Sequence, residues 1–183
     1  MTTIIDTLTE RNEDFAAHRF SAGLSLMPTL RTMVVGCVDP RVDPAYVLGL
    51  GLGEAAVIRN IGGRITPATL QTMALLGMIP RLEGAGSTGG LNLVVLHHTD
   101  CGITRLARVP DLLAGYFGIA TEDLDAKAVA DPHAAVRVDV AALRANPSLP
   151  GDVVVSGLVY DVATGRVETI VAPAPLRDER QGP

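Results

Sequence analysis

The sequence predicts an α/β fold: a mostly parallel sheet of four strands with a C-terminal antiparallel strand, and helices on both faces. Short apolar, β-branched runs alternate with helix-compatible segments, the order that parallel strands joined by right-handed crossovers require. The first run, residues 32–36, is short, apolar and β-branched, which is typical of a strand buried on both faces. The last two runs flank the turn Ala163-Thr164-Gly165, which predicts a hairpin. The chain of 183 residues has the length of one domain, so we expect a single domain over residues 1–183.

The first half of the chain contains three predicted strands and the start signals of helices. An Asp or Thr followed by Pro marks two helices, because the first side chain caps the helix and proline suits its first position. Apolar and charged residues mix near the N-terminus, so we expect a peripheral helical arm over residues 1–27. In order, the expected elements are a helix within 4–20, a strand at 32–36, a helix beginning at Asp43-Pro44, a strand at 55–58, a helix beginning at Thr66-Pro67 and a strand at 91–96.

The second half predicts one more helix and two more strands. We expect the helix over 134–144, a strand over 153–160 and its hairpin partner over 166–171. The segment from Gly84 to Gly90 is rich in Gly, Ser and Thr, so it is predicted to be a flexible loop. Residues 173–183 are predicted to form a loose, polar tail.

Composition and charge exclude several classes of function. The formal net charge is −5, and no block of Lys or Arg supplies the positive charge that a nucleic-acid backbone attracts. An aromatic content of 3% leaves few rings for stacking on bases. No stretch of about 20 residues is apolar enough to cross a bilayer, and the N-terminus lacks the pattern of a secretory signal. We therefore expect a cytoplasmic protein with neither nucleic acid nor membrane as a partner.

The two cysteines of the chain lie among other residues with chemical side chains. Cys37 and Asp39 follow the first expected strand, while His98 and Cys101 follow the third. Because parallel strands carry their ligand-binding loops at their carboxyl ends, we expect the two groups to converge at one edge of the sheet. Two thiolates and an imidazole suit Zn²⁺, and three protein ligands leave a fourth position for water. His97 alternates to the other face of its strand and is predicted to be a structural neighbour.

The role of Asp39 has two interpretations. In the first, Asp39 is the permanent fourth ligand of a closed, structural zinc site. In the second, Arg41 holds the carboxylate in a charge-assisted pair, and Asp39 accepts a proton from zinc-bound water instead of taking its place. An Asp-x-Arg pair is ordinarily a surface ion pair of little energetic value. Its position beside a predicted metal ligand favours the second interpretation.

Three motifs together resemble the β-class carbonic anhydrases, in particular the short, archaeal-like branch of that family. They are Cys37-Val38-Asp39-Pro40-Arg41, Arg59-Asn60-Ile61-Gly62-Gly63 and His98-Thr99-Asp100-Cys101-Gly102, in that order along the chain. The similarity is strongest from about Arg31 to Arg105. Pro40 departs from this pattern, because the family usually has Ser or Ala at that position. Proline fixes φ and removes an N–H, so the path of this loop can differ from the path in the family.

The resemblance implies a reaction and the residues that carry it. The reaction is the reversible hydration of carbon dioxide to bicarbonate and a proton, with one Zn²⁺ per chain. A backbone N–H of Gly102 is implied as a donor to the substrate. The other implied roles are zinc ligation by Cys37, His98 and Cys101 and catalysis by Asp39 and Arg41, with Asp39 as a fourth ligand in a closed state.

The resemblance also implies an assembly, and it leaves two alternatives open. Family members form homodimers that can pair into tetramers, and their N-terminal helix embraces the partner subunit. A related hydrolase acting on carbon disulfide or carbonyl sulfide would share every motif quoted. A zinc-binding protein without turnover is the alternative from a different functional class.

Overall fold

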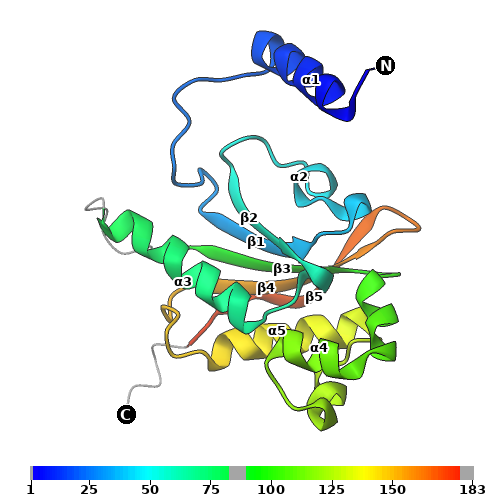
Figure 1. The fold of residues 1–183 in the computed structure, drawn as a ribbon. Helices are drawn as coiled ribbons and strands as arrows, with labels where there is room; N and C mark the ends of the chain where they lie inside the picture. Colours follow the sequence, from blue (N-terminus) through cyan, green and yellow to red (C-terminus); the bar gives the residue numbers. More distant parts are fainter. Residues whose placement is uncertain (1, 83–89, 178–183) are drawn as a thin grey trace.

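The computed structural model describes residues 2–82 and 90–177, which form a five-stranded sheet with helices around it (Figure 1). The strand order is β2-β1-β3-β4-β5. Strands β2, β1, β3 and β4 are mutually parallel, and β5 runs antiparallel to β4. The predicted fold class is therefore confirmed. The strands are β1 Thr32–Cys37, β2 Ala55–Asn60, β3 Asn92–His98, β4 Val154–Asp161 and β5 Arg166–Pro175.

The pairing of β1 with both of its neighbours decides where the strand ends lie. Strand β1 pairs with β2 on one side and β3 on the other, so that Gly36 is opposite both Arg59 and Leu96. The C-terminal ends of all three strands therefore reach the same edge of the sheet. Cys37 ends β1 and His98 ends β3, which brings the loops that follow them to that edge.

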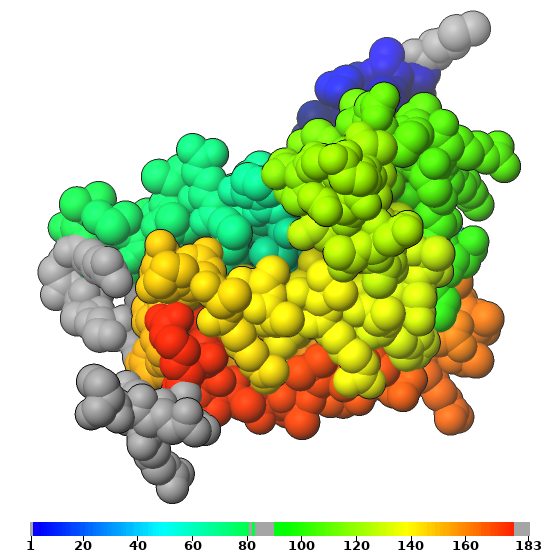
Figure 2. All heavy atoms as spheres, turned by 90° about the horizontal axis from the view of Figure 1, so that it is seen from below, coloured from blue at the N-terminus to red at the C-terminus, as the bar shows by residue number. Residues whose placement is uncertain are grey.

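Helices α3 and α5 lie along one face of the sheet with α4 near them, while the short α2 lies on the other side and α1 beyond it (Figure 1). Figure 2, seen from below, shows α5 packed beside the segment that follows α4, with β5 along the border. Proline occupies the first turn of α2, α4 and α5, where its missing N–H costs nothing. The helices are α1 Ile4–His18, α2 Pro44–Val47, α3 Pro67–Leu82, α4 Pro110–Phe117 and α5 Pro132–Ala145.

The main hydrophobic core fills the space between the sheet and helices α3 and α5. Val35, Val95 and Val155 lie in β1, β3 and β4 and are fully buried. Met73 from α3 and Leu143 from α5 pack against this layer. Because such interiors are close-packed, the central strands form a rigid base for the loops at their carboxyl ends.

Helix α1 lies apart from the sheet, and none of its residues is buried. A capping box between Thr3 and Asp6 fixes its start, since each side chain accepts the backbone N–H of the other residue. The apolar side chains of Ile4, Ile5 and Leu8 are 68%, 62% and 51% exposed. The predicted N-terminal arm is therefore present as a helix, and it leaves its apolar side chains uncovered by the described part of the chain.

The end of the chain is more ordered than predicted, and the predicted glycine-rich loop falls mostly outside the described residues. The loose tail predicted for 173–183 is wrong up to Arg177, because β5 continues to Pro175 and the N–H groups of Leu176 and Arg177 donate to the carbonyls of Val153 and Gly151. Leu176 is also buried in the core, which supplies the apolar contact that orders this end of the chain. Residues 84–89 of the predicted glycine-rich loop lie outside the described residues, as do residues 178–183.

Helix α4 and the 3₁₀ helices on either side of it were not predicted. These elements are Gly102–Arg108, Pro110–Phe117 and Thr121–Lys127. Helix α4 has only eight residues, too few to show a helical repeat, although Pro110 and Gly118 mark its two ends. None of the described helices is both long and apolar enough to cross a lipid bilayer.

Candidate metal centre

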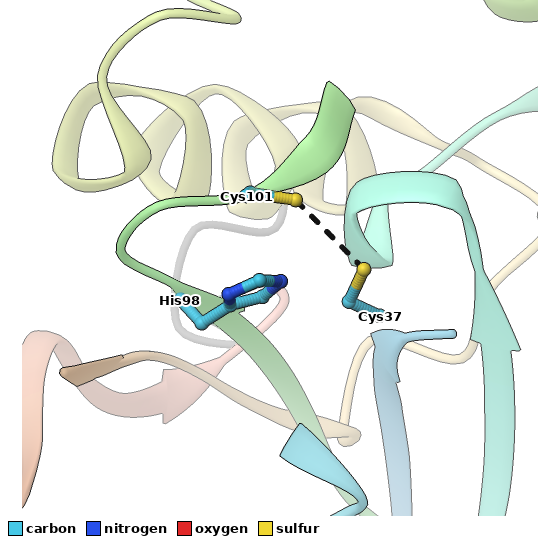
Figure 3. Close-up of side chains that lie close together, drawn as sticks. All are labelled: Cys37, His98 and Cys101. Atoms are coloured by element: carbon cyan, nitrogen blue, oxygen red, sulfur yellow. Dashed lines mark hydrogen bonds between the residues drawn. The ribbon is translucent and has the colours of Figure 1, made fainter. Parts of the chain in front are cut away.

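Three side chains able to bind a metal meet at the carboxyl edge of the sheet (Figure 3). Cys37 comes from the end of β1, His98 from the end of β3, and Cys101 from the loop that follows. Their ligand atoms all lie within 4.8 Å of one another, and all three residues are buried. The two groups that were expected to converge therefore do so. No second group of this kind occurs in residues 2–82 and 90–177.

The spacing and hydrogen bonding of this cluster fit a zinc ion. The sulfurs of Cys37 and Cys101 are 3.8 Å apart, far beyond a disulfide bond of about 2.05 Å. Two sulfurs bound tetrahedrally at about 2.3 Å from one zinc lie about 3.8 Å apart. Nδ1 of His98 lies 2.8 Å from the carbonyl oxygen of Thr99, which assigns the ring proton to Nδ1. Nε2 of His98 is buried without a hydrogen-bond partner among the described residues, as a nitrogen meant for a metal would be.

Hydrogen bonds favour the thiolate form of Cys37. The neighbouring Cys101 thiol has the largest effect and, with two backbone N–H groups, it holds the pKa of Cys37 well below its ordinary value against the opposing effect of burial. The N–H groups are those of Asp39 and Gly62, at 3.4 and 3.3 Å from Sγ. The same pairing, together with burial, raises the pKa of the Cys101 thiol. The backbone N–H groups thus favour a thiolate at Cys37, and the thiolate is the form in which a cysteine binds metal ions.

Asp39 and Arg41 form the pair that the sequence suggests, and Asp100 joins them. Nε and Nη2 of Arg41 donate to the two carboxylate oxygens of Asp39 at 3.0 and 2.7 Å. Nη1 of Arg41 donates to the carboxylate of Asp100 at 2.8 Å, and Nη2 reaches the Asp100 carbonyl at 3.0 Å. Both oxygens of Asp39 are thus occupied by Arg41. Through Asp100, Arg41 also links the loop of Cys37 to the loop of Cys101.

Pro40 fits this loop without disturbing the pair. It occupies the first position of the 3₁₀ helix Pro40–Val42, where no backbone N–H is needed. The Asp39 side chain caps the same helix by accepting the N–H of Arg41 at 2.9 Å. The departure from Ser or Ala at position 40 therefore leaves the contact between Asp39 and Arg41 in place.

Arg59 holds the Cys37 loop from the neighbouring strand, a role that sequence reasoning missed. Its Nε donates to the carbonyl of Cys37 at 2.9 Å and its Nη2 to the carbonyl of Asp39 at 2.8 Å. Its Nη1 pairs with the carboxylate of Asp43, which caps α2. The sequence does indicate such a role: Arg59 directly follows the apolar run of residues 55–58, and a charge beside a buried strand needs polar partners.

The loop Ile61–Gly63 packs directly against Cys37 and needs glycine to do so. Gly63 has φ +66°, and a Cβ there would lie 2.9 Å from the carbonyl oxygen of Leu96 and 3.0 Å from the backbone N of Cys37. The hydroxyl of Tyr116 donates to the carbonyl of Ile61 at 2.8 Å and so holds the loop from α4. Close approach of this backbone is what brings the N–H of Gly62 to the Cys37 sulfur.

The structure also shows the surroundings of His97 and Gly102, two further residues singled out from the sequence. His97 points away from the cluster, is 2% exposed, and lies 3.1 Å from a carboxylate oxygen of Asp139. The prediction that it is a structural neighbour of His98 is confirmed. Gly102 is exposed directly after Cys101, with open space around it. Its role as a donor to a substrate stays a prediction.

A cavity of about 210 Å³ opens beside the cluster. His98 and Cys101 line it together with the apolar side chains of Ile103, Val129 and Ala135. A partly apolar cavity of this size suits a small molecule and gives it access to two of the three ligand side chains.

Comparison with known proteins places these features in a family. The family model for carbonic anhydrase matches residues 32–115. The solved carbonic anhydrase of Streptococcus mutans is 32% identical, and the match covers 93% of this chain and 99% of that chain with a TM-score of 0.70. Beta-carbonic anhydrase 1 of Mycobacterium tuberculosis is 28% identical, with 92% of this chain and 98% of the relative covered. A carbon disulfide hydrolase of an Acidianus species is 27% identical, with 89% and 87% covered.

The fold and the cluster define an α/β protein with a Cys-His-Cys cluster able to bind a metal ion at the carboxyl edge of a mostly parallel sheet. Because the similarity to solved and curated relatives extends over almost the whole chain, the chain belongs to the β-class carbonic anhydrases, a family of lyases.

The ionisation of Asp39 should depend on Arg41. The side-chain hydrogen bond from Arg41 lowers the pKa of Asp39 from 3.8 to about 2. Because this pKa is depressed on folding, the contribution of the pair to stability is present above about pH 4 and is lost as the pH falls toward 2. We expect Arg41→Ala to return the pKa of Asp39 toward its ordinary value, measured by ¹³C NMR of the Asp39 carboxyl group.

A matched control for this titration is Arg105→Ala. Arg105 lies 3.9 Å from the carboxylate of Asp100 and has no part in the shift of Asp39. The pKa of Asp39 should therefore be unchanged in Arg105→Ala. An ordinary pKa for Asp39 in the wild-type protein would contradict the assignment.

Proposed function

We propose that this chain is a zinc enzyme that catalyses the reversible hydration of carbon dioxide to bicarbonate and a proton. The observation that carries the proposal is the buried Nε2 of His98, which has no partner among the described residues and lies within 4.8 Å of the sulfurs of Cys37 and Cys101. These three side chains are the proposed ligands of one zinc ion per chain. Asp39, held by Arg41 close to Cys37, is the proposed catalytic carboxylate.

Zinc at this position would lower the pKa of a coordinated water to about 7 and so supply a nucleophile at neutral pH. Asp39 accepts the hydrogen bond of the attacking water at Oδ2, which accepts only from Nη2 of Arg41 and keeps a lone pair, whereas Oδ1 already accepts from the backbone N–H and Nε of Arg41. Arg41 keeps Asp39 ionised and oriented through its two donors. The N–H of Gly102 is the proposed donor to an oxygen of the substrate.

A related hydrolase that acts on carbon disulfide or carbonyl sulfide is the first alternative. The relative from Acidianus is named as a carbon disulfide hydrolase, and it matches 89% of this chain. Carbon dioxide and both sulfur compounds are small linear molecules, so the cavity of about 210 Å³ favours none of them by size. The second alternative, a zinc-binding protein without turnover, is opposed by the engagement of Asp39 with Arg41.

The proposed reaction is tested by isotope exchange between ¹⁸O-labelled bicarbonate and water, catalysed by the zinc-loaded protein. We expect exchange well above the uncatalysed rate and one zinc per chain by elemental analysis. Cys101→Ser should lose most of its zinc and its activity, because a serine hydroxyl is a far weaker zinc ligand than a thiolate. Full zinc occupancy in that variant would refute the ligand assignment. Hydrolysis of carbon disulfide without isotope exchange would support the first alternative.

Asp39 and Arg41 should affect activity without removing the metal. In Arg41→Ala the carboxylate of Asp39 loses its competing partner and can swing onto the metal, so activity should fall by about 10²-fold or more while zinc stays bound. Asp39→Asn should also be impaired with its zinc retained. Normal activity of Arg41→Ala at neutral pH would exclude the orienting role. Loss of zinc from Asp39→Asn would instead make Asp39 a structural ligand of a closed site.

We further propose that the chain acts as a homodimer that can pair into tetramers. Support comes from α1, where the apolar side chains of Ile4, Ile5 and Leu8 lie exposed on a well-capped helix. A second copy would bury them. We also propose a cytoplasmic location, because a reducing compartment keeps Cys37 and Cys101 as free thiols.

Light scattering tests the assembly. The smallest stable species should have at least twice the chain mass of 19.1 kDa. Ile4→Asp combined with Leu8→Asp should shift the protein toward monomer, because both changes place charge on the apolar face of α1. Ala17→Asp, on the opposite face of the same helix, is the control and should leave the mass unchanged. A folded, active wild-type monomer would exclude this assembly.

A further inference from the structure

A buried group of charged and polar side chains lies behind the candidate metal centre, and neither the comparisons nor the proposed mechanism gives it a role. Arg64, Asp139 and His97 are 1%, 1% and 2% exposed. Nε of Arg64 donates to Oδ2 of Asp139 at 2.7 Å, and Nη2 of Arg64 lies 3.3 Å from Oδ1. Nε2 of His97 lies 3.1 Å from the same Oδ2. Two opposite charges are thus fully buried between the sheet and α5.

Burying such a group opposes folding, because its charges lose their hydration. The desolvation of an ion pair can exceed its Coulombic gain, and well-packed apolar side chains of similar volume often stabilise a protein equally well or better. Stability alone therefore does not account for the group. The contacts of the group point to a second role, because they reach two segments of the candidate metal centre.

Arg64 connects the group to Cys37. It directly follows the loop Ile61–Gly63, whose Gly62 N–H lies 3.3 Å from the Cys37 sulfur. The Arg64 side chain is held by Asp139, by the carbonyl of Lys127 at 2.7 Å, and by the ring of Phe117 at 4.9 Å. The loop is thereby anchored to α5 through a side chain that has almost no freedom to move.

His97 connects the same carboxylate to His98. Adjacent residues of a strand point to opposite faces, so the bond from His97 to Asp139 turns His98 toward Cys37 and Cys101. One side chain on α5 therefore restrains two segments that position the candidate ligands. These are the loop against Cys37 and the end of β3.

We propose that Arg64, Asp139 and His97 are positioning residues of the metal centre, which hold the Gly62 amide and the end of β3 in the geometry that binds the ion. This inference rests on the proposed zinc site. None of the three side chains is among the proposed zinc ligands, although Arg64 and His97 also line the cavity beside them. They act through Gly62 and His98, so their loss should change the affinity for metal and the electronic environment of the thiolate.

The test replaces the ion pair by apolar side chains in the full-length protein, as Arg64→Met with Asp139→Leu. Removing both charges together avoids leaving one of them buried and unpaired. We measure the dissociation constant for Zn²⁺ by competition with a chelator, and the thiolate-to-metal absorption band of the Co²⁺-substituted protein. Loss of support behind metal ligands typically costs about 10–100-fold in metal affinity, and we expect a loss of that size together with a shifted band.

The matched control is Val140→Ala, next to Asp139 on α5 and 1% exposed. It removes core contacts without touching the buried group, so it should lower stability and leave the affinity for Zn²⁺ and the Co²⁺ band unchanged. A second variant, His97→Phe, keeps the ion pair of Arg64 and Asp139 and should also weaken Zn²⁺ binding and shift the band.

Wild-type affinity and an unshifted band in both the double variant and His97→Phe would overturn the inference. So would an equal loss of affinity in Val140→Ala, because the effect would then follow stability alone. A wild-type protein that binds no zinc would refute the proposed function itself, and that outcome is distinct from either of these.

Discussion

The register between β1 and β3 is the constraint on which the metal centre depends. These strands are parallel and paired residue for residue, so Cys37 and His98 leave the sheet at the same edge although they lie far apart in sequence. The chain has two consecutive histidines at the end of β3, and the pleat sends one to each face. A slip of one residue would exchange His97 and His98, because the side chains of a strand alternate strictly.

Close approach of backbone to backbone is the second requirement of this edge. Gly63 lets the loop after β2 press against β1, at a distance where any Cβ would collide with the carbonyl of Leu96. Tyr116 holds this loop through the carbonyl of Ile61, and Arg64 anchors its end to Asp139. Arg59 holds the adjacent loop through the carbonyl of Cys37. The cluster owes its shape to groups that are themselves not metal ligands.

The sequence predicted the sheet well because its signals are local. Strands β1 to β4 each contain a short apolar run, and Asp43-Pro44 and Thr66-Pro67 mark two helix starts directly. The convergence of Cys37 with His98 and Cys101 followed from the carboxyl-edge rule for parallel strands. Helix α4 and the order of residues 173–177 could not be predicted, because the helix is very short and Leu176 is ordered by a distant core contact.

The supporting residues were harder to predict than the candidate ligands for a physical reason. Asp139 is a single polar residue on a helix, and Arg64 is a single charged residue after a glycine turn. They lie 75 residues apart, and nothing in the sequence indicates that they are in contact. The predicted pair of Asp39 and Arg41 lies two residues apart, where contact is nearly automatic. Partners remote in sequence become visible only when the tertiary fold brings them together.

The separation of the candidate ligands also bears on the stage of folding at which a metal ion could bind. Cys37 and Cys101 are 64 residues apart, and strands β1, β2 and β3 must be assembled before their sulfurs can meet. In a small zinc domain with closely spaced ligands, the metal nucleates the structure. Here the apolar layer of Val35, Val95 and Val155 builds the sheet from side chains that are not candidate ligands. A metal ion at this site would therefore bind to a sheet that has already formed, and it would stabilise the fold without being needed to nucleate it.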